Sequence, residues 1–220
     1  EKTGASVIPF GVGNSHQLIV TILLLNPSAI HCTPSYLKKL EFIITNDFHL
    51  KAKDLKIKLG LFGAESGLQN TEFRKNIEDI WGMKAMNSNY GMSDVLSMFG
   101  SECIYQNGLH FLGLEVLYPE LIDPKTLKSL SFKSGAVGEL VLTNLKKESQ
   151  PVIRYRTNDI IKILSTDQCK CGYNGFIFEV VGRSDDMFVI KGINIFTSSI
   201  ENILNEFHEI NKGVFQILIN

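Results

Sequence analysis

Residues 29–62 read AIHCTPSYLKKLEFIITNDFHLKAKDLKIKLGLF. The spacing of apolar residues in this stretch predicts a strand at Ala29–Cys32, a helix at Ser35–Ile44 and a second strand at Lys56–Phe62. The pair Thr33-Pro34 suits the start of that helix, because threonine caps helices well and the first helical position does not need the N–H that proline lacks. Strand, helix and strand in succession predict an α/β fold with parallel strands.

The same alternation continues on both sides of this stretch. We predict a strand at Ala5–Phe10 and a helix at Ser15–Leu25 before it, then a helix at Thr71–Trp81 and a strand at Lys84–Asn89 after it. The apolar run Leu18–Leu25 falls well short of the ~20 residues that cross a bilayer. We therefore interpret it as a buried helix and expect no membrane partner.

Beyond residue 100 the pattern changes to strands separated by Asp-Pro, Gly and Cys-Gly punctuation rather than by helices. The predicted strands are Leu109–Ile122, Gly138–Leu145, Val152–Tyr155, Ile160–Leu164 and Phe176–Val181. We therefore expect a large domain over residues 1–184, which is α/β to residue 100 and β-rich from residue 101.

From Asp185 the pattern resets once more. We predict a strand at Met187–Lys191, a turn at residues 192–194, a helix opened by the capping box Ser198-x-x-Glu201 with Phe207 on its apolar face, and a final strand at Val214–Ile219. Residues 185–220 are thus expected to begin a small C-terminal α+β domain.

Composition excludes some classes of function. The 220 residues carry 22 basic and 23 acidic side chains, so no basic surplus exists to hold a phosphate backbone, and nucleic acid is not expected as a partner. Four cysteines are too few for a secreted domain held together by disulfides. A reducing, cytoplasmic location is the expectation.

Two turns carry the first candidate site residues, because ligands of open α/β sheets lie beyond the carboxyl ends of the strands. In Phe62-Gly63-Ala64-Glu65, small residues let a flat ligand approach the backbone. Asn89-Tyr90-Gly91-Met92-Ser93-Asp94 offers an aromatic ring, a hydroxyl and a carboxylate, which suit a nucleotide with Mg²⁺. Taken alone, each turn is weak evidence, because a glycine after a strand is more often simple turn chemistry.

Two later segments add charged groups. Ile153-Arg154-Tyr155-Arg156-Thr157-Asn158-Asp159 ends in a carboxylate suited to a pair of vicinal hydroxyls, and Gly182-Arg183-Ser184-Asp185-Asp186 lies where the pattern resets. The structural alternative is that Tyr155 and Arg156 pack and cap a strand end, and that Asp185-Asp186 is a solvated turn.

Taken in order, Tyr90-Gly91-Met92-Ser93-Asp94, Tyr155-Arg156-Thr157-x-Asp159 and Gly182-Arg183-Ser184-Asp185-Asp186-Met187 resemble the motifs of the adenylate-forming acyl-CoA synthetase superfamily. The sequence is most similar to its phenylacetate-CoA ligase branch, which includes the coenzyme F390 synthetase-like proteins. Four further segments suggest this branch: Thr33-Pro34-Ser35-Tyr36-Leu37, Cys103 through Gly108-Leu109-His110, Tyr118-Pro119-Glu120-x-Ile122-Asp123-Pro124, and Gly192-Ile193-Asn194-Ile195-Phe196.

The resemblance implies a nucleotide site. Gly63, Ala64 and Glu65 match the strip that lies along adenine, and Tyr90 matches the aromatic residue that stacks on the base. The neighbouring members of that motif, Asn89, Gly91 and Met92, are carried over as nucleotide-binding residues. Asp159 matches the carboxylate that holds the ribose, and Arg183 matches a nucleotide-contacting arginine.

The resemblance also implies a chemistry. A carboxylic acid attacks the α-phosphate of ATP to give an acyl-adenylate, and the thiol of CoA then displaces AMP. Ser93 would contact the phosphate, Asp94 would serve Mg²⁺, and Asp185 matches the hinge of the small domain. Asp94 stands where the family usually has glutamate, and its shorter reach favours coordination through water. The implied partners are a phenylacetate-like aryl acid, ATP and CoA, with a homodimer as a possible assembly.

A second cluster of ligands suggests a structural metal. Cys169-Lys170-Cys171-Gly172 is a tight turn with two thiols, and Cys103-x6-His110 offers a third thiol and an imidazole. Three cysteines and one histidine form a ligand set that structural Zn²⁺ favours. The alternative is a group of free thiols. Cys32 is predicted to be a small buried apolar residue.

Parts of the family pattern are missing. The Ser/Thr/Gly-rich phosphate loop of the form S-G-T-T-G-x-P is absent, and so is the catalytic lysine near the end of the small domain. We therefore expect the middle of a ligase, a fragment that is inactive alone. Two other readings stay open: a non-catalytic remnant that binds nucleotide or is stabilised by zinc, and an adenylate-forming enzyme with a different acceptor.

Overall fold

The computed structural model describes residues 4–11, 13–65, 67–190 and 193–204. Its helices are α1 (Ser15–Leu25), α2 (Pro34–Asn46), α3 (Thr71–Trp81) and α4 (Thr197–Leu204), with a 3₁₀ turn η1 (Ala52–Leu55). Its strands are β1 (Ala29–Cys32), β2 (Leu59–Gly63), β3 (Lys84–Met92), β4 (Leu96–Glu102), β5 (Leu109–Phe111), β6 (Leu117–Ile122), β7 (Ser129–Leu130), β8 (Val137–Asn144), β9 (Tyr155–Ser165), β10 (Ile177–Arg183), β11 (Met187–Ile190) and β12 (Ile193–Phe196).

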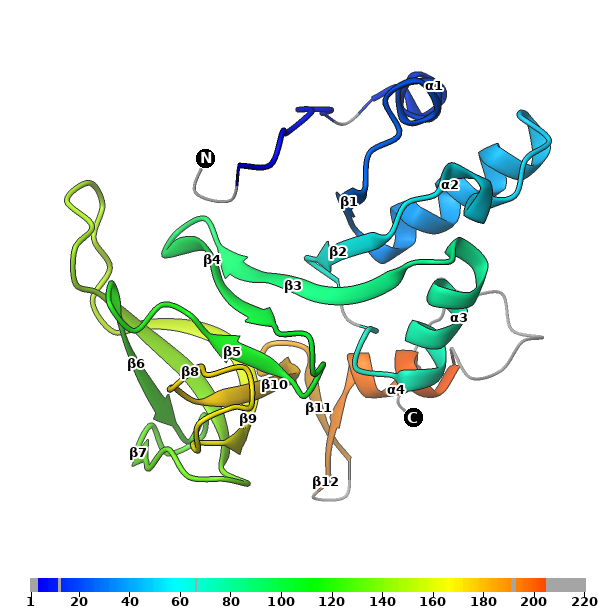
Figure 1. Cartoon of the computed structure of the whole chain (residues 1–220). Coiled ribbons are helices and arrows are strands. Elements are labelled where there is room, and N and C mark those ends of the chain that lie inside the picture. Colours follow the sequence, from blue (N-terminus) through cyan, green and yellow to red (C-terminus); the bar gives the residue numbers. More distant parts are fainter. Residues whose placement is uncertain (1–3, 12, 66, 191–192, 205–220) are drawn as a thin grey trace.

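One mixed sheet organises the described part of the chain (Figure 1). Its ten strands run in the order β1-β2-β3-β4-β5-β10-β9-β8-β6-β7. The first three strands are parallel, as the α/β pattern predicts, and the neighbouring pairs from β3 to β7 are antiparallel. The α/β fold class is therefore confirmed.

Local signals account for the N-terminal elements. The predicted bounds of α1, β1 and α3 are confirmed, and α2 extends its prediction by one residue at the start and two at the end. The Thr33 hydroxyl accepts a hydrogen bond from the Tyr36 amide, so the predicted cap is present. Helix α3 begins after Asn70, which caps two backbone amides, and ends at Gly82 in the left-handed conformation.

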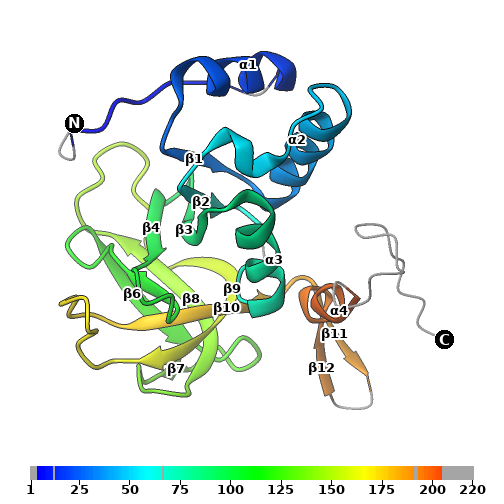
Figure 2. The same cartoon turned by 45° about the vertical axis from the view of Figure 1, so that its right-hand side comes forward.

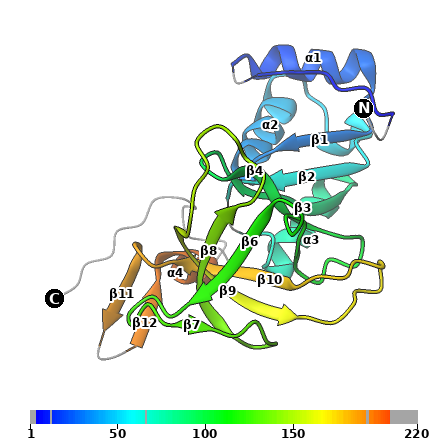
Figure 3. The same cartoon turned by 90° about the vertical axis from the view of Figure 1, so that its left-hand side faces the viewer.

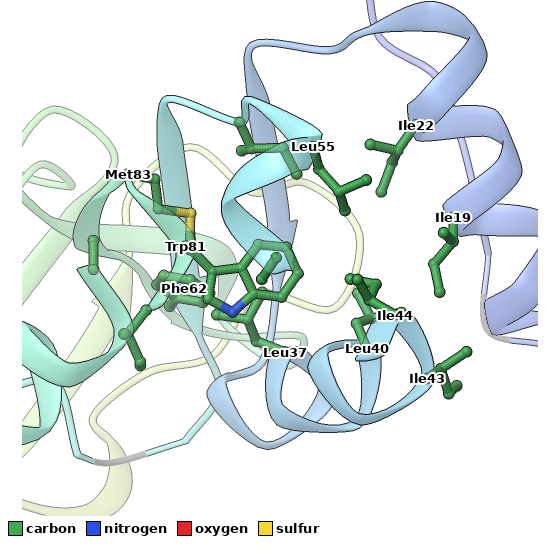
Figure 4. Close-up of a cluster of buried hydrophobic side chains, with 14 of the residues drawn as sticks. Ile19, Ile22, Leu37, Leu40, Ile43, Ile44, Leu55, Phe62, Trp81 and Met83 are labelled. Atoms are coloured by element: carbon green, nitrogen blue, oxygen red, sulfur yellow. The ribbon is translucent and has the colours of Figure 1, made fainter. Parts of the chain in front are cut away.

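Helices α1, α2 and α3 share one apolar core with the parallel strands. Figure 4 shows Trp81 of α3 beside Phe62 of β2, with Ile19 of α1 facing the side chains of α2. Trp81 and Phe62 are 1% and 0% exposed. A separate aromatic core, which contains Phe99, fills the antiparallel part of the sheet. Each part of the sheet thus buries its own apolar face.

Strand β3 joins the two parts. It pairs in parallel with β2 from Lys84 to Asn89 and antiparallel with β4 at Tyr90 and Met92. In Figure 2 and Figure 3, α1 and α2 lie with β1 and β2 on one side of this strand and the antiparallel strands lie on the other, while the β11–β12 hairpin and α4 project beyond the end of β10. The division into domains at residues 184 and 185 stays a prediction.

Several predicted strands are wrong in their bounds. Ala5–Phe10 is irregular, and Val7 within it is 81% exposed, so this apolar segment is not a buried strand. The predicted strand Leu109–Ile122 is split into β5 and β6 by a turn, in which the amides of Val116 and Leu117 both bond the Gly113 carbonyl.

Other differences concern the ends of strands. Val152 lies outside any strand, and the predicted strand Ile160–Leu164 is part of the longer β9. Ile193 and Asn194 belong to β12 rather than to a turn, and α4 begins at Thr197, one residue before its predicted cap. Phe207 and the predicted strand Val214–Ile219 lie outside the described residues.

A buried ion pair fixes α3 to the sheet. The Arg74 guanidinium donates to both carboxylate oxygens of Glu102, at 2.7 and 3.0 Å, and to the Leu68 carbonyl. Glu102 also accepts a bond of 2.8 Å from the Asn87 amide of β3. The side chains of Arg74 and Glu102 are only 11% and 5% exposed. This network therefore connects α3, β3 and β4.

Removing one partner of this pair should be costly. We expect Arg74→Met to lower the free energy of unfolding by about 3–5 kcal/mol, because it leaves the buried Glu102 carboxylate without its cation. The matched control is Arg154→Met, since Arg154 is 58% exposed in its ion pair with Glu120 and should lose at most about 1 kcal/mol. Urea denaturation measures both, and equal losses would contradict this assignment.

Candidate functional site

A cavity of about 670 Å³ lies where the two parts of the sheet meet. Its volume is within the range of small-molecule sites. Among the candidate residues, those that line it are Ala64, Glu65, Asn89, Tyr90, Gly91, Asp159 and Arg183. Gly63, Met92, Ser93, Asp94 and Asp185 are not among the lining residues. The cavity therefore brings together residues from all four motifs.

Tyr90, Asp159 and Arg183 form a hydrogen-bonded group at this cavity. The Tyr90 hydroxyl donates to one oxygen of Asp159 at 2.7 Å, and the Arg183 guanidinium donates to the other at 3.1 Å. Burial and the nearby Asp159 charge raise the pKa of Tyr90 well above its usual value, so its hydroxyl remains a donor. Each carboxylate oxygen of Asp159 keeps a lone pair for a further donor.

The pKa of Asp159 reflects two opposing effects. Burial raises it above the ordinary value for aspartate, while the bonds from Tyr90 and Arg183 act to lower it. The raised pKa shows that burial is the larger effect. A ligand hydroxyl that donates to this carboxylate would add stabilisation of its charged form.

The ring of Tyr90 is held in one orientation by two other aromatic rings. Phe99 meets it edge-on with centroids 5.1 Å apart, and Phe178 does so at 5.4 Å. A β-carbon at Gly100, which pairs with Tyr90 across β3 and β4, would touch the tyrosine ring. The ring is thus positioned before any ligand arrives.

Close packing of strands explains why glycine occupies positions 63 and 91. A β-carbon at Gly63 would collide with the Asn89 carbonyl, and one at Gly91 would collide with the Ser97 carbonyl. Both glycines are therefore required by the pairing of β3 with its neighbours. Ala64, which follows Gly63 at the edge of the cavity, has a φ of 65°, an unfavourable value for a residue with a side chain.

The segment Asn89–Asp94 is not a turn along its whole length. Asn89, Tyr90, Gly91 and Met92 lie within β3, because β4 pairs with this end of the strand. Only Ser93 and Asp94 lie in the turn that follows, and both are exposed. The prediction of a six-residue turn was wrong for this reason.

The Asp94 carboxylate accepts a hydrogen bond of 3.4 Å from the Tyr155 hydroxyl. Lys147 donates to the Asp94 carbonyl at 2.7 Å. Mg²⁺ in nucleotide sites is commonly bound by one or two carboxylates together with phosphate oxygens, so one exposed, oriented carboxylate fits such a role. Arg156, by contrast, pairs with the fully buried Glu139, as the structural alternative for that segment predicts.

Arg183 connects two segments. It forms a bidentate pair with Asp185, at 2.9 and 2.6 Å, in addition to its bond to Asp159. The hydrogen bond from Arg183 lowers the pKa of Asp185. Asp185 thus lies just beyond Arg183, the last residue of β10, and is tied to this arginine, which also reaches the cavity.

The four predicted metal ligands lie together. One ligand atom each from Cys103, His110, Cys169 and Cys171 falls within 4.8 Å of all the others. The thiols of Cys103 and Cys169 are 3.9 Å apart, and the Cys171 thiol is 3.6 Å from Nε2 of His110. Tetrahedral Zn²⁺ with Zn–S of ~2.3 Å places two sulfurs about 3.8 Å apart and a sulfur about 3.5 Å from a histidine nitrogen.

The electrostatics of this cluster suit a metal ion. Hydrogen bonds from the Cys171 amide and from His110 lower the pKa of the Cys169 thiol to about 6, which favours the thiolate form that binds metals. His110 is 2% exposed, and its Nδ1 is buried without a partner in the described part of the chain. The three cysteines of the cluster, like Cys32, form no disulfide bond. The donor set therefore fits Zn²⁺.

Sequence reasoning missed some residues of the cavity. Asn87 lines it together with Asn89 and Gly91, which follow at every second position of β3. That period of two was a usable signal, because alternate residues of a strand share a face. Gln69 and Glu179 also line the cavity, and no motif indicates either of them.

Comparison with known proteins gives the following relatives. No family model matches the chain. It is 36% identical over 202 residues to a phenylacetate-coenzyme A ligase of Pseudomonas putida, covering 91% of this chain and 44% of that protein. It is 32% identical over 222 residues to the Escherichia coli K12 protein of the same name, covering 100% of this chain and 48% of that protein. The chain thus spans about half the length of these relatives.

Solved structures with a similar fold are also CoA ligases. A 2-hydroxyisobutyryl-CoA ligase in the postadenylation state, in complex with R3-HIB-AMP, has a TM-score of 0.78 at 28% identity, over 91% of this chain and 42% of that one. An anthranilate CoA ligase in complex with anthranoyl-AMP has a TM-score of 0.63 at 15% identity, over 94% and 39%, which supports the fold alone. In sequence this chain is therefore similar to the phenylacetate-coenzyme A ligases, and in fold it is similar to solved acyl-CoA ligases.

Proposed function

We propose that the chain carries the nucleotide site of an ATP-dependent ligase that joins an aryl acid, such as phenylacetate, to CoA through an acyl-adenylate. The observation that carries this proposal is the group Tyr90–Asp159–Arg183 at a cavity that Ala64 also lines. The names of the relatives support the reaction, and the adenylates bound to the structural neighbours support the intermediate.

In the proposed complex, adenine lies between the Gly63–Ala64 backbone and the ring of Tyr90. The ribose hydroxyls donate to the free lone pairs of Asp159, whose carboxylate is held in place by two donors. Arg183 supplies positive charge beside the nucleotide. Asn89, Gly91 and Met92 fix this arrangement as parts of β3.

The proposed reaction has two halves. The substrate carboxylate attacks the α-phosphorus of ATP and pyrophosphate leaves, which gives the acyl-adenylate. The sulfur of CoA then attacks the acyl carbon, loses its proton, and AMP leaves. Ser93 would donate a hydrogen bond to phosphate, and Asp94 would hold Mg²⁺, which offsets the phosphate charge.

We assign Asp185 to the hinge between a large domain ending near residue 184 and a small one that follows. A rotation there would let one cavity serve both half-reactions. The bidentate pair with Arg183 would hold the hinge in the arrangement described here. A homodimer remains part of the proposal.

We further propose that Cys103, His110, Cys169 and Cys171 bind a structural Zn²⁺. Four protein ligands leave no open position for a substrate, which is the pattern of structural zinc. Cys103 follows β4, His110 lies in β5, and the other two cysteines lie between β9 and β10. The ion would therefore clip the ends of these neighbouring strands together.

Tyr90 provides the first test. We expect Tyr90→Ala to weaken AMP binding by about 1–3 kcal/mol, the usual contribution of an aromatic ring that stacks on a base. Tyr90→Phe should retain most of the affinity, because it keeps the ring and removes only the bond to Asp159. Isothermal titration calorimetry measures both variants, with thermal melting as the check on folding. Unchanged affinity in Tyr90→Ala would exclude stacking on this ring.

The reaction itself can be measured as pyrophosphate release from ATP and phenylacetate. We expect no appreciable release from these 220 residues, because they lack the phosphate loop and the lysine whose charge the adenylation step requires. A chimera that adds the flanking parts of the Pseudomonas putida relative should release pyrophosphate, and should form acyl-CoA when CoA is added. A chimera that binds AMP yet stays inactive would favour a non-catalytic remnant.

The proposed zinc site gives a further prediction. Elemental analysis should find one Zn²⁺ per chain, and a chelator should lower the melting temperature, because binding energy at a structural site is folding energy. Cys171→Ser should lose the metal. The matched control is Cys32→Ser, which changes a cysteine outside the cluster and should leave the metal content at one. Zinc-free protein with an unchanged melting temperature would contradict the assignment.

A further inference from the structure

The Glu65 carboxylate is bound by the first turn of α2. One of its oxygens accepts a hydrogen bond of 2.9 Å from the Ser35 amide, and the other accepts one of 2.6 Å from the Ser35 hydroxyl. Thr33 contacts the same hydroxyl at 3.1 Å and caps the Tyr36 amide. A side chain from the loop after β2 thus holds the start of a helix that lies 30 residues earlier in the sequence.

The location of this contact is electrostatically favourable. The amides at a helix N-terminus carry partial positive charge and lack partners within the helix, so a carboxylate there is stabilised. The Cys32 thiol, at the end of β1, has its pKa raised to about 12 by burial and by the Glu65 charge. The Glu65 charge therefore lies at the edge where β1 ends and α2 begins.

This contact fixes one end of the strip Gly63-Ala64-Glu65, of which Ala64 and Glu65 line the cavity. Ala64 has a φ of 65°, and this left-handed conformation is unfavourable for a residue with a side chain. Such a conformation persists only where its surroundings impose it. On one side of Ala64, Gly63 is packed against Asn89 of β3. On the other side, Glu65 is tied to Ser35.

We propose that Ser35 is a positioning residue of the nucleotide site, which holds Glu65 and thereby the Gly63–Ala64 backbone in the conformation that receives a flat base. The proposal rests on the nucleotide-binding function given above. In this proposal, Glu65 supports the Gly63–Ala64 backbone. The strip is then held at two points, by strand pairing before Ala64 and by the helix N-terminus after it.

A direct contact between the Glu65 carboxylate and the nucleotide is the competing explanation. Both oxygens of Glu65 are already bonded to Ser35, at distances typical of charge-assisted hydrogen bonds. A free carboxylate would also repel the phosphates of ATP. The two explanations predict different behaviour when both residues are changed.

A double-mutant cycle separates them. We expect Ser35→Ala and Glu65→Gln each to weaken AMP binding about five- to tenfold, the effect of losing one hydrogen bond. The double variant should be no weaker than the poorer single variant, because both changes break the same contact. Ser35→Thr, which keeps the hydroxyl, should restore the affinity. Additive losses would show that Glu65 contacts the nucleotide itself and would overturn the proposal.

The matched control is Ser134→Ala. Ser134 is an exposed serine whose hydroxyl bonds the Leu164 carbonyl, away from the cavity, so AMP affinity should not change. Thermal melting of every variant identifies loss of affinity that comes from unfolding.

Amide hydrogen exchange tests the positioning role without any ligand. In Ser35→Ala, exchange at residues 63–65 should become faster, while exchange in α3 should not change. If the unaltered chain fails to bind AMP, the proposed function fails, and the exchange data still show whether Ser35 holds the strip. Unchanged exchange in Ser35→Ala would overturn the proposal whatever the AMP affinity.

Discussion

The described structure depends on one strand that pairs differently along its two edges. Strand β3 pairs in parallel with β2 and antiparallel with β4, so it belongs both to the α/β part and to the antiparallel part. Gly63 of β2 lies against Asn89 of β3, and Gly91 of β3 lies against Ser97 of β4. At both glycines the strands are so close that a side chain would collide with a backbone carbonyl. Tyr90 lies between these points. Its place beside the cavity follows from the pairing, not from a flexible loop.

Polar groups around β3 fix it more firmly than the strand pairing alone. The Asn87 amide bonds Glu102, whose charge Arg74 balances, and the Tyr90 hydroxyl bonds Asp159. Buried polar groups are costly unless they are paired, so each of these bonds favours one position of the strand. The proposed nucleotide site thus rests on a rigid element, which keeps low the cost of ordering the site when a ligand binds.

The sequence predicts elements with local signals well, as α1, β1 and α3 show. Their caps and periodicities lie within the elements themselves. It fails for β4, for the second half of β3 and for the split of Leu109–Ile122, because these depend on partners that are distant in sequence. The candidate site follows the same rule. Motifs indicated some of the cavity residues and all four metal ligands, whereas pairs such as Ser35–Glu65 and Arg74–Glu102, about 30 residues apart, left no signal.

The cavity and the metal cluster are two sides of one piece of sheet. Leu109 lines the cavity, and the next residue of β5, His110, belongs to the metal cluster. Successive residues of a strand point to opposite faces, so one short strand serves both. Strand β10 pairs with β5 at Leu109 and His110 and contributes Glu179 and Val180 to the cavity. A metal that joins the ends of these strands would therefore hold one wall of the cavity in place, although none of its ligands lines that cavity. In this arrangement the zinc ligands would support nucleotide binding by fixing the position of β5 and β10 rather than by touching the substrate.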